Sequence, residues 1–200
     1  MTTIDGLPAL AWTHGEGQLS YQPEGGVLTL TSAAGVDWIH DARSGQKSQT
    51  ATSWAFRPAD GDFLLSVRAR VEPPRTTFDA AVLTLWADAD HWAKLCFEYS
   101  PQGEPMVVSV VTDDYSDDSN GPVVAGNEVH LRVARLGPAW AFHFSTDGLH
   151  WHFVRVFRLG TPAPTLVGFL AQAPTGPSCT VHFDQVSYTE ETLADLRDGR

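Results

Sequence analysis

The residues best suited to chemistry lie in segment 88–100 (DADHWAKLCFEYS). If this segment is a strand, Trp92, Lys94 and Glu98 point to the same face, because successive side chains alternate between the two faces of a sheet. An aromatic ring can cover the apolar face of a sugar, while charged groups hydrogen-bond to its hydroxyls. The spacing favours a sheet face that binds a saccharide or another polyhydroxylated metabolite. A solvated face with cross-strand ion pairs is the alternative.

An acidic segment, 112–121 (TDDYSDDSNG), is predicted to be a loop. Its four aspartates are hard oxygen ligands of the kind that calcium takes, although their spacing is not that of the helix-flanked calcium loop. The alternatives are a solvated acidic turn, and a loop that closes one rim of a ligand site through Tyr115 and Asp117.

Five more residues are candidate ligand contacts. Trp38 and His40 lie in a glycine-bounded segment that could curl over the sheet, although burial of Trp38 is an equal alternative. Arg132, His143 and Gln172 fall on the polar faces of predicted strands that could neighbour segment 92–100.

Catalysis is a second hypothesis, in which Glu98 serves a glycoside hydrolase or lyase as acid or base. A retaining glycosidase needs a second carboxyl group about 5–5.5 Å away. The folded chain could bring Asp79, Asp88 or Asp113 close enough to Glu98 to serve as this second carboxyl group. Neither a Gly-x-Ser-x-Gly nucleophile motif nor a glycine-rich phosphate loop occurs.

His150 and His152 have a spacing seen in metal sites, but the sequence fixes no third ligand. We therefore predict no metal and no other cofactor, with calcium left open.

Composition narrows the partners and the compartment. The 200 residues carry a net charge of −11, which disfavours nucleic acid and anionic membranes. The N-terminal segment does not resemble a secretory signal, and no run approaches the roughly 20 apolar residues of a membrane span. The two cysteines, Cys96 and Cys179, are expected to be reduced, so a cytoplasmic protein is predicted. A protein partner or a homodimer remains open.

The fold that must position these residues is predicted to be all-β. Segment 62–72 (DFLLSVRARVE) alternates between apolar and polar residues, as a half-buried strand does. About ten such strands, separated by turns, indicate a sandwich of two antiparallel sheets. We expect one domain over 1–200, with its core at about 10–188. The tail 189–200 is predicted to be a short helix, capped by Thr189. The other expected strands are 26–32, 53–57, 79–87, 92–100, 106–112, 128–134, 139–145, 151–158, 165–172 and 179–188.

Several segments, in this order, resemble one family. They are 62–70 (DFLLSVRAR), 79–100, the acidic segment after 107–112, 166–174 (LVGFLAQAP) and 179–188 (CTVHFDQVSY). The resemblance covers about residues 10–188. The chain resembles a domain-of-unknown-function family in the concanavalin A-like lectin/glucanase superfamily. Some members of this family are described as proteins that regulate enolase.

This resemblance implies a concanavalin A-like jelly roll with a concave sheet. By position, Trp92, Lys94 and Glu98 match the family's Trp-x-Lys-x-x-x-Glu strand. Residues 113–118 match a loop near that face, and the stretch around Trp38 matches an aromatic-rich Asp-Trp segment. The chain departs from the pattern at 38–40, where many relatives have an aromatic-basic pair. It has Val82 and Ala173 where relatives often have Gly and Ser. The enolase description would imply a regulatory, protein-binding role.

Overall fold

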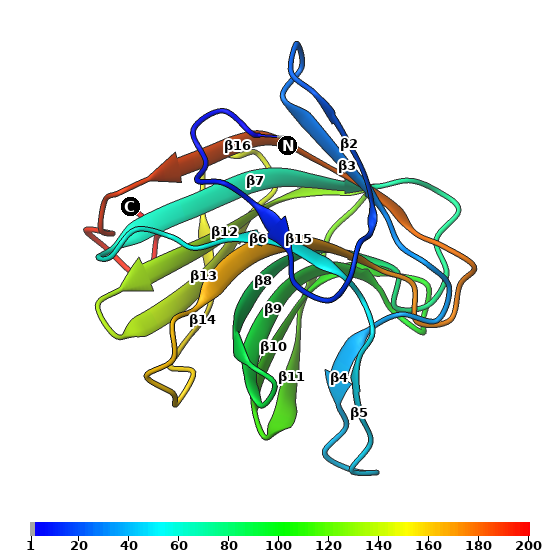
Figure 1. The fold of residues 1–200 in the computed structure, drawn as a ribbon. Helices are drawn as coiled ribbons and strands as arrows, with labels where there is room; N and C mark the ends of the chain where they lie inside the picture. Colours follow the sequence, from blue (N-terminus) through cyan, green and yellow to red (C-terminus); the bar gives the residue numbers. More distant parts are fainter. Residues whose placement is uncertain (1–2) are drawn as a thin grey trace.

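Two seven-stranded antiparallel sheets make up the body of the molecule (Figure 1). The structure is a computed structural model that describes residues 3–200, so residues 1 and 2 of the predicted domain lie outside the described part. Sheet A has the strand order β1 (Ala11–Trp12), β6 (Ser53–Phe56), β15 (Leu166–Gln172), β8 (Ala80–Asp88), β9 (His91–Tyr99), β10 (Pro105–Asp113) and β11 (Tyr115–Val123). Sheet B has the order β14 (His152–Phe157), β13 (Ala139–Ser145), β12 (Glu128–Leu136), β7 (Phe63–Val71), β16 (Thr180–Thr189), β3 (Val27–Thr31) and β2 (Gln18–Gln22).

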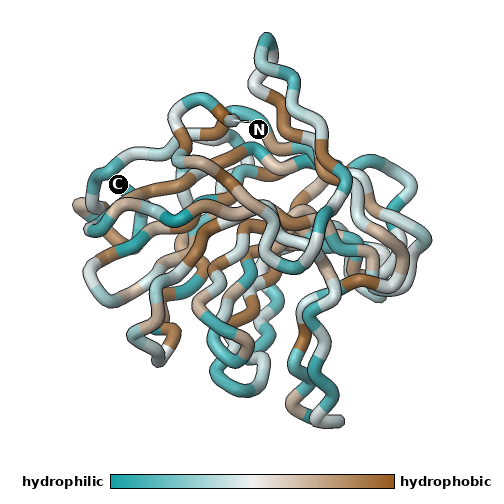
Figure 2. The backbone as a smooth tube through the Cα atoms, viewed as in Figure 1, coloured by the Kyte–Doolittle hydropathy of each residue, from teal (hydrophilic) through white to brown (hydrophobic). Residues whose placement is uncertain are grey.

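The main core fills the space between the two sheets. The predicted alternation of segment 62–72 is confirmed, because the odd-numbered residues of β7 are buried and the even-numbered ones are partly exposed. In β9 the residues that face the main core are Ala93, Leu95 and Phe97. Figure 2 shows hydrophilic residues gathered in the turns that join the strands. The fold is therefore the all-β sandwich that the sequence predicts.

The acidic segment 112–121 is largely a strand and not a loop, so that prediction was wrong. Asp114, with φ 65°, turns the chain tightly, and β11 then pairs with β10 from Asp113↔Tyr115 onward. As the last strand of sheet A, β11 tolerates Pro122, since an edge strand need not donate every amide. Gly121 is required by close packing, because a Cβ there would lie 2.8 Å from the carbonyl oxygen of Val107.

The predicted C-terminal helix is also absent from residues 189–200. Thr189, the expected helix cap, instead extends β16 and pairs with Leu64. The chain after it forms turns that lie against sheet B, where the ring of His143 contacts the carbonyl oxygen of Leu196 at 2.8 Å. Tertiary hydrogen bonds therefore outweigh the local preference for a helix, which is weak in a segment of only about three turns.

A short hairpin stands apart from the two large sheets. It consists of β4 (Trp38–His40) and β5 (Lys47–Gln49), and Figure 1 shows it projecting below them. Trp38 anchors it in a second apolar cluster, which lies on the face of sheet A that points away from the main core. The other members of this cluster are Ala51, Ala80, Val82, Trp92, Cys96, Met106, Val108, Val110 and Leu170.

Candidate functional site

Trp92, Lys94 and Glu98 do share the outer face of sheet A, but Trp92 is not available for stacking on a ligand. Its side chain is 0% exposed. The ring of Trp38 lies 5.7 Å from it and the ring of His40 lies 5.4 Å from it, both in edge-on geometry. The expectation of an open tryptophan was wrong because the β4–β5 hairpin folds over this end of the face.

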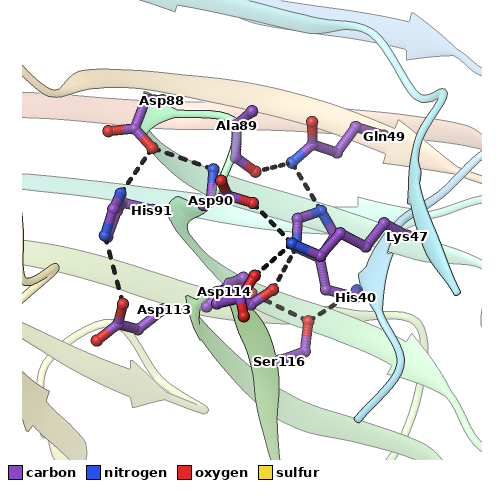
Figure 3. Close-up of polar contacts among 11 residues, drawn as sticks. His40, Lys47, Gln49, Asp88, Ala89, Asp90, His91, Asp113, Asp114 and Ser116 are labelled. Atoms are coloured by element: carbon purple, nitrogen blue, oxygen red, sulfur yellow. Dashed lines mark hydrogen bonds and ion pairs between the residues drawn. The ribbon is translucent and has the colours of Figure 1, made fainter. Parts of the chain in front are cut away.

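A polar network pins this hairpin to two turns of sheet A (Figure 3). The ammonium of Lys47 contacts Asp90, in the β8–β9 turn, at 2.8 Å, and it also pairs with Asp114 in the β10–β11 turn. The side-chain amide of Gln49 donates to the carbonyl oxygen of Ala89. These contacts fix β5, one of the two strands of the hairpin.

His40 of β4 is part of the same network, and both of its ring nitrogens have a partner. Its Nδ1 lies 2.8 Å from the carbonyl oxygen of Asp114, which can only accept, so Nδ1 carries the proton. Its Nε2 lies 3.1 Å from the side-chain amide of Gln49 and accepts from it. The hydroxyl of Ser116 accepts a hydrogen bond from the backbone amide of His40. His40 therefore positions the hairpin and is 3% exposed.

Beside the hairpin, the same face of sheet A is hollowed into a pocket of about 320 Å³, which we call the Lys94 pocket. Strands β9, β10, β11 and β15 form its floor, and the chain around β4 forms one wall. Its lining residues are Asp37, Ile39, Asp41, Phe78, Lys94, Glu98, Val108, Val110, Asp118, Asn120 and Gln172. The lining is mixed, with polar and charged side chains beside four apolar ones, Ile39, Phe78, Val108 and Val110.

Lys94 is the fixed charge of this pocket. It is 2% exposed, and its Nζ lies 3.0 Å from Oδ1 of Asp37 and 3.0 Å from Oε1 of Gln172. Burial acts to lower the pKa of Lys94, but Asp37, Cys96 and Glu98 together outweigh burial, and the pKa is raised above its usual value. The lysine is therefore a permanently charged donor, held in place by Gln172 of β15 and by Asp37 in the segment before β4.

Glu98 and Asp118 are carboxyl groups of the same pocket. Burial, together with the neighbouring carboxylates of Asp37 and Asp118 and against the opposing charge of Lys94, raises the pKa of Glu98 to about 7. Partial burial and the carboxylate of Asp37 raise the pKa of Asp118 as well. Near neutral pH the pocket therefore holds a carboxyl group that can exchange a proton.

The raised pKa of Glu98 predicts a pH dependence of stability. The folded protein binds this proton more tightly than the unfolded chain does, so the free energy of unfolding falls as pH rises from 4.5 to about 7. Replacing Glu98 with glutamine removes this effect, and we expect the variant to gain about 2 kcal/mol over wild type between about pH 5 and about pH 8, allowing for partial solvent access. Urea unfolding at the two pH values measures the difference. Glu104→Gln, which removes an exposed carboxylate from the β9–β10 turn, is the matched control, and a Glu98→Gln profile parallel to wild type would contradict the prediction.

Of the other predicted contacts, only Gln172 reaches the pocket as expected. Tyr115 is 42% exposed at the tip of the β10–β11 hairpin, where the ammonium of Lys47 lies 5.3 Å from its ring centre. Asp117 points to the opposite face of β11 and pairs with Arg155 of sheet B at 3.1 Å. The predicted rim through Tyr115 and Asp117 is therefore not formed.

Arg132 and His143 are far from segment 92–100 in the strand order, because β12 and β13 belong to sheet B. The guanidinium of Arg132 stacks 3.6 Å from the ring centre of Trp151 and donates to the carbonyl oxygen of Gly199. Both residues hold the C-terminal tail, and the expectation that they neighbour Lys94 was wrong.

Four polar residues of the pocket were not singled out as ligand contacts: Asp37, Asp41, Asp118 and Asn120. Asp118 and Asn120 pair with Val110 and Val108 in the β10–β11 ladder, so the even-numbered residues of β11 face the pocket. The signal was the alternation of Ser116, Asp118 and Asn120, which is recognisable only if the segment is treated as a strand.

Metal binding finds no support in the geometry. Within residues 3–200, no three His, Cys, Asp or Glu side chains are grouped so that they could hold an ion. The four aspartates considered for calcium are dispersed: Asp113 lies near His91, Asp114 pairs with Lys47, Asp117 pairs with Arg155, and Asp118 lines the pocket. Cys96 and Cys179 are buried and free.

Across residues 3–200, no helix has the length and apolar character to span a membrane.

Known structures share this architecture. A functionally unknown protein from Saccharomyces cerevisiae is 26% identical, with a TM-score of 0.79 over 90% of this chain and 95% of that chain. The carbohydrate binding module CBM66 from Bacillus subtilis is 11% identical, with a TM-score of 0.54 over 88% of this chain and 94% of the module. A xylan beta-1,4-xylosidase from Bacillus halodurans C-125 is 17% identical, with a TM-score of 0.65 over 82% of this chain but only 33% of the enzyme. The last two likenesses bear on the fold alone.

No curated protein sequence matches the chain. The family described as "Protein of unknown function (DUF1349)" matches residues 12–191. Together with the jelly-roll neighbours, this match confirms the family resemblance of segments 62–70, 79–100 and 166–188. The chain belongs to the DUF1349 family and has a two-sheet jelly-roll fold.

Proposed function

We propose that this protein is a non-catalytic binding module that takes a saccharide, or a similar polyhydroxylated small molecule, in the Lys94 pocket. The observation that carries the proposal is the buried Lys94, clamped by Asp37 and Gln172 at the base of a cavity with further carboxyl groups. Burying a charge is costly, and such a costly, fixed arrangement is typical of a site prepared for a ligand.

The chemistry of the lining suits hydroxyl groups. A sugar hydroxyl both donates and accepts, so it can accept from an ammonium or amide donor and donate to a carboxylate. Lys94, Asn120 and Asp118 supply these roles on one surface. The side chains of Ile39, Val108 and Val110 offer apolar contact to the C–H face of a ring, in the place expected for Trp92.

The size of the cavity supports a small ligand. Its volume of about 320 Å³ lies at the lower end of the range of small-molecule sites, which favours a monosaccharide or the end of a longer chain. The chain also resembles a carbohydrate binding module and one third of a xylosidase. This likeness of fold supports a saccharide as the ligand class.

Adjacent aspartates of β11 provide a matched test of this site. We expect a saccharide panel, screened by thermal shift and then by calorimetry, to contain a ligand whose affinity falls about tenfold in Asp118→Asn, because a charge-assisted hydrogen bond is lost. Asp117→Asn removes the same charge from the opposite face and should bind like wild type. A panel without any binder, or equal losses in the two variants, would contradict the proposal.

Hydrolysis of a glycoside is a second candidate function, favoured by one observation. Glu98, with its pKa of about 7, lines the same cavity as a second carboxyl group, Asp118. A protonated and an ionised carboxyl group together are what an acid–base glycosidase uses. Release of nitrophenol from nitrophenyl glycosides by wild type, and not by Glu98→Gln, would favour this reaction over simple binding.

A further inference from the structure

The Lys94 pocket contains more negative than positive charge. Its lining holds one ammonium group, Lys94, and the carboxyl groups of Asp37, Asp41, Glu98 and Asp118. Asp37 neutralises Lys94, to which it is joined at 3.0 Å. None of the other three carboxyl groups forms an ion pair with a side chain of residues 3–200.

These three carboxyl groups differ in how far the protein itself satisfies them. Oδ1 of Asp41 accepts hydrogen bonds from the backbone amides of Arg43 and Ser44, so it has a structural role in the hairpin turn. Glu98 accepts only one long hydrogen bond, of 3.4 Å, from the amide of Gln172 to its Oε2, and its Oε1 has no partner within the described residues. The carboxyl group of Asp118 likewise has no hydrogen-bond partner in residues 3–200. Glu98 and Asp118 are therefore the acceptors that the fold leaves for a ligand.

The strand order sets these two groups around one space. Val110 of β10 pairs with Lys94 on one side and with Asp118 on the other, so these three residues form one row across the sheet. Glu98 lies two pleats along β9 from Lys94 and projects to the same face. The fixed positive charge of Lys94 is thus already paired with Asp37, and neither Glu98 nor Asp118 forms an ion pair of its own with a cation of residues 3–200.

We propose that the ligand of this pocket carries a protonated primary amine beside its hydroxyls, as an amino sugar or an aminopolyol does, and that the ammonium faces Glu98 and Asp118. This inference rests on the proposed saccharide-binding function and narrows its ligand class. An ammonium donates up to three hydrogen bonds, which matches acceptors that lack donors, and it compensates the surplus charge. A neutral sugar would satisfy the hydroxyl-binding groups and leave this charge uncompensated.

Binding of an ammonium is coupled to a proton on Glu98. The charged groups that face Glu98 are Asp37 from the segment before β4, Lys94 from β9, Asp118 from β11, and Arg75, whose guanidinium lies on the ring of Phe97. Since burial and the two aspartates raise the pKa of Glu98 to about 7, part of the population carries a proton on Glu98 at neutral pH. A cationic ligand favours the ionised carboxylate, so this proton is released to the solvent when the ligand binds. Affinity for the ammonium should therefore rise as pH increases through neutrality.

Matched pairs of compounds, differing only in one amine for one hydroxyl, test the inference in the full chain. The pairs are D-glucosamine and D-glucose, D-galactosamine and D-galactose, and D-glucamine and D-sorbitol, measured by calorimetry. We expect the amine of at least one pair to bind about tenfold more tightly than its hydroxyl partner, which corresponds to one charge-assisted contact. Asp118→Asn should remove this preference, and Asp117→Asn should keep it.

D-Glucamine also tests the proton coupling, because its alkyl amine stays protonated throughout. Its affinity for wild type should rise about tenfold between about pH 6 and about pH 8, following the ionised fraction of Glu98, and should not change with pH in Glu98→Gln. Neutral sugars that bind as tightly as their amines would overturn the ammonium inference and leave the proposed function standing. If no member of any pair binds, both the inference and saccharide binding at this pocket are wrong.

Discussion

Replacing Lys94 with methionine lowers the free energy of unfolding by about 3 kcal/mol at neutral pH, the low end of the range for breaking a buried ion pair. Lys94 is 2% exposed, and its charge stabilises the carboxylate of Asp37, whose side chain is 21% exposed. Methionine fills a similar volume, so the loss comes from electrostatics and hydrogen bonding, not from a cavity. The residual solvent access of Asp37 is the reason for placing the loss at the low end. Urea unfolding followed by circular dichroism measures it.

A double variant separates the ion pair from the site around it. Asp37→Asn combined with Lys94→Met removes both charges and should recover most of the stability, because the cost lies in leaving one partner unpaired. The oxygen of asparagine can still accept from the backbone amide of Trp38, as Oδ1 of Asp37 does. A loss below about 1 kcal/mol in the single variant would mean that water solvates Asp37 without Lys94.

Replacing Trp38 with alanine should cost about 3–5 kcal/mol, because the variant loses a large, fully buried side chain in the second apolar cluster. Trp38 packs on Trp92 and donates its indole N–H to the carbonyl oxygen of Ala51 at 2.7 Å. It is the apolar anchor of the β4–β5 hairpin, whose remaining contacts with sheet A are mostly polar and partly exposed. Chemical unfolding gives the loss directly.

Phenylalanine at position 38 is the graded control for this prediction. It keeps a ring over Trp92 but loses the hydrogen bond to Ala51 and part of the volume, so we expect a loss of about 1–2 kcal/mol. Equal stability of wild type and Trp38→Ala would mean that the hairpin contributes nothing to the folded state. In that case the wall of the Lys94 pocket would not be a fixed surface.

Several features of this protein follow from the sequence alone. Alternation along β7 and β9 predicts both the strands and their two faces, because neighbouring residues of a strand must point in opposite directions. Leu95 and Phe97 therefore go to the main core, while Trp92, Lys94 and Glu98 go to the outer face. The turn at Gly137–Pro138 is equally local, since the residues themselves favour it. These are properties of short segments and of their own backbone geometry.

The composition of the pocket depends on contacts that local patterns do not encode. Asp118 and not Asp117 enters it because β11 pairs with β10 in one register, and a shift of one residue would exchange them. Gln172 joins Lys94, whereas Arg132 and His143 go to the other sheet, because strand order is set by packing over the whole chain. Trp92 alternates like an exposed residue and is nevertheless sealed by a hairpin more than 40 residues before it. Sequence decides which face a side chain occupies; only the tertiary structure decides what covers that face, because burial there results from the packing of segments that are distant in the chain.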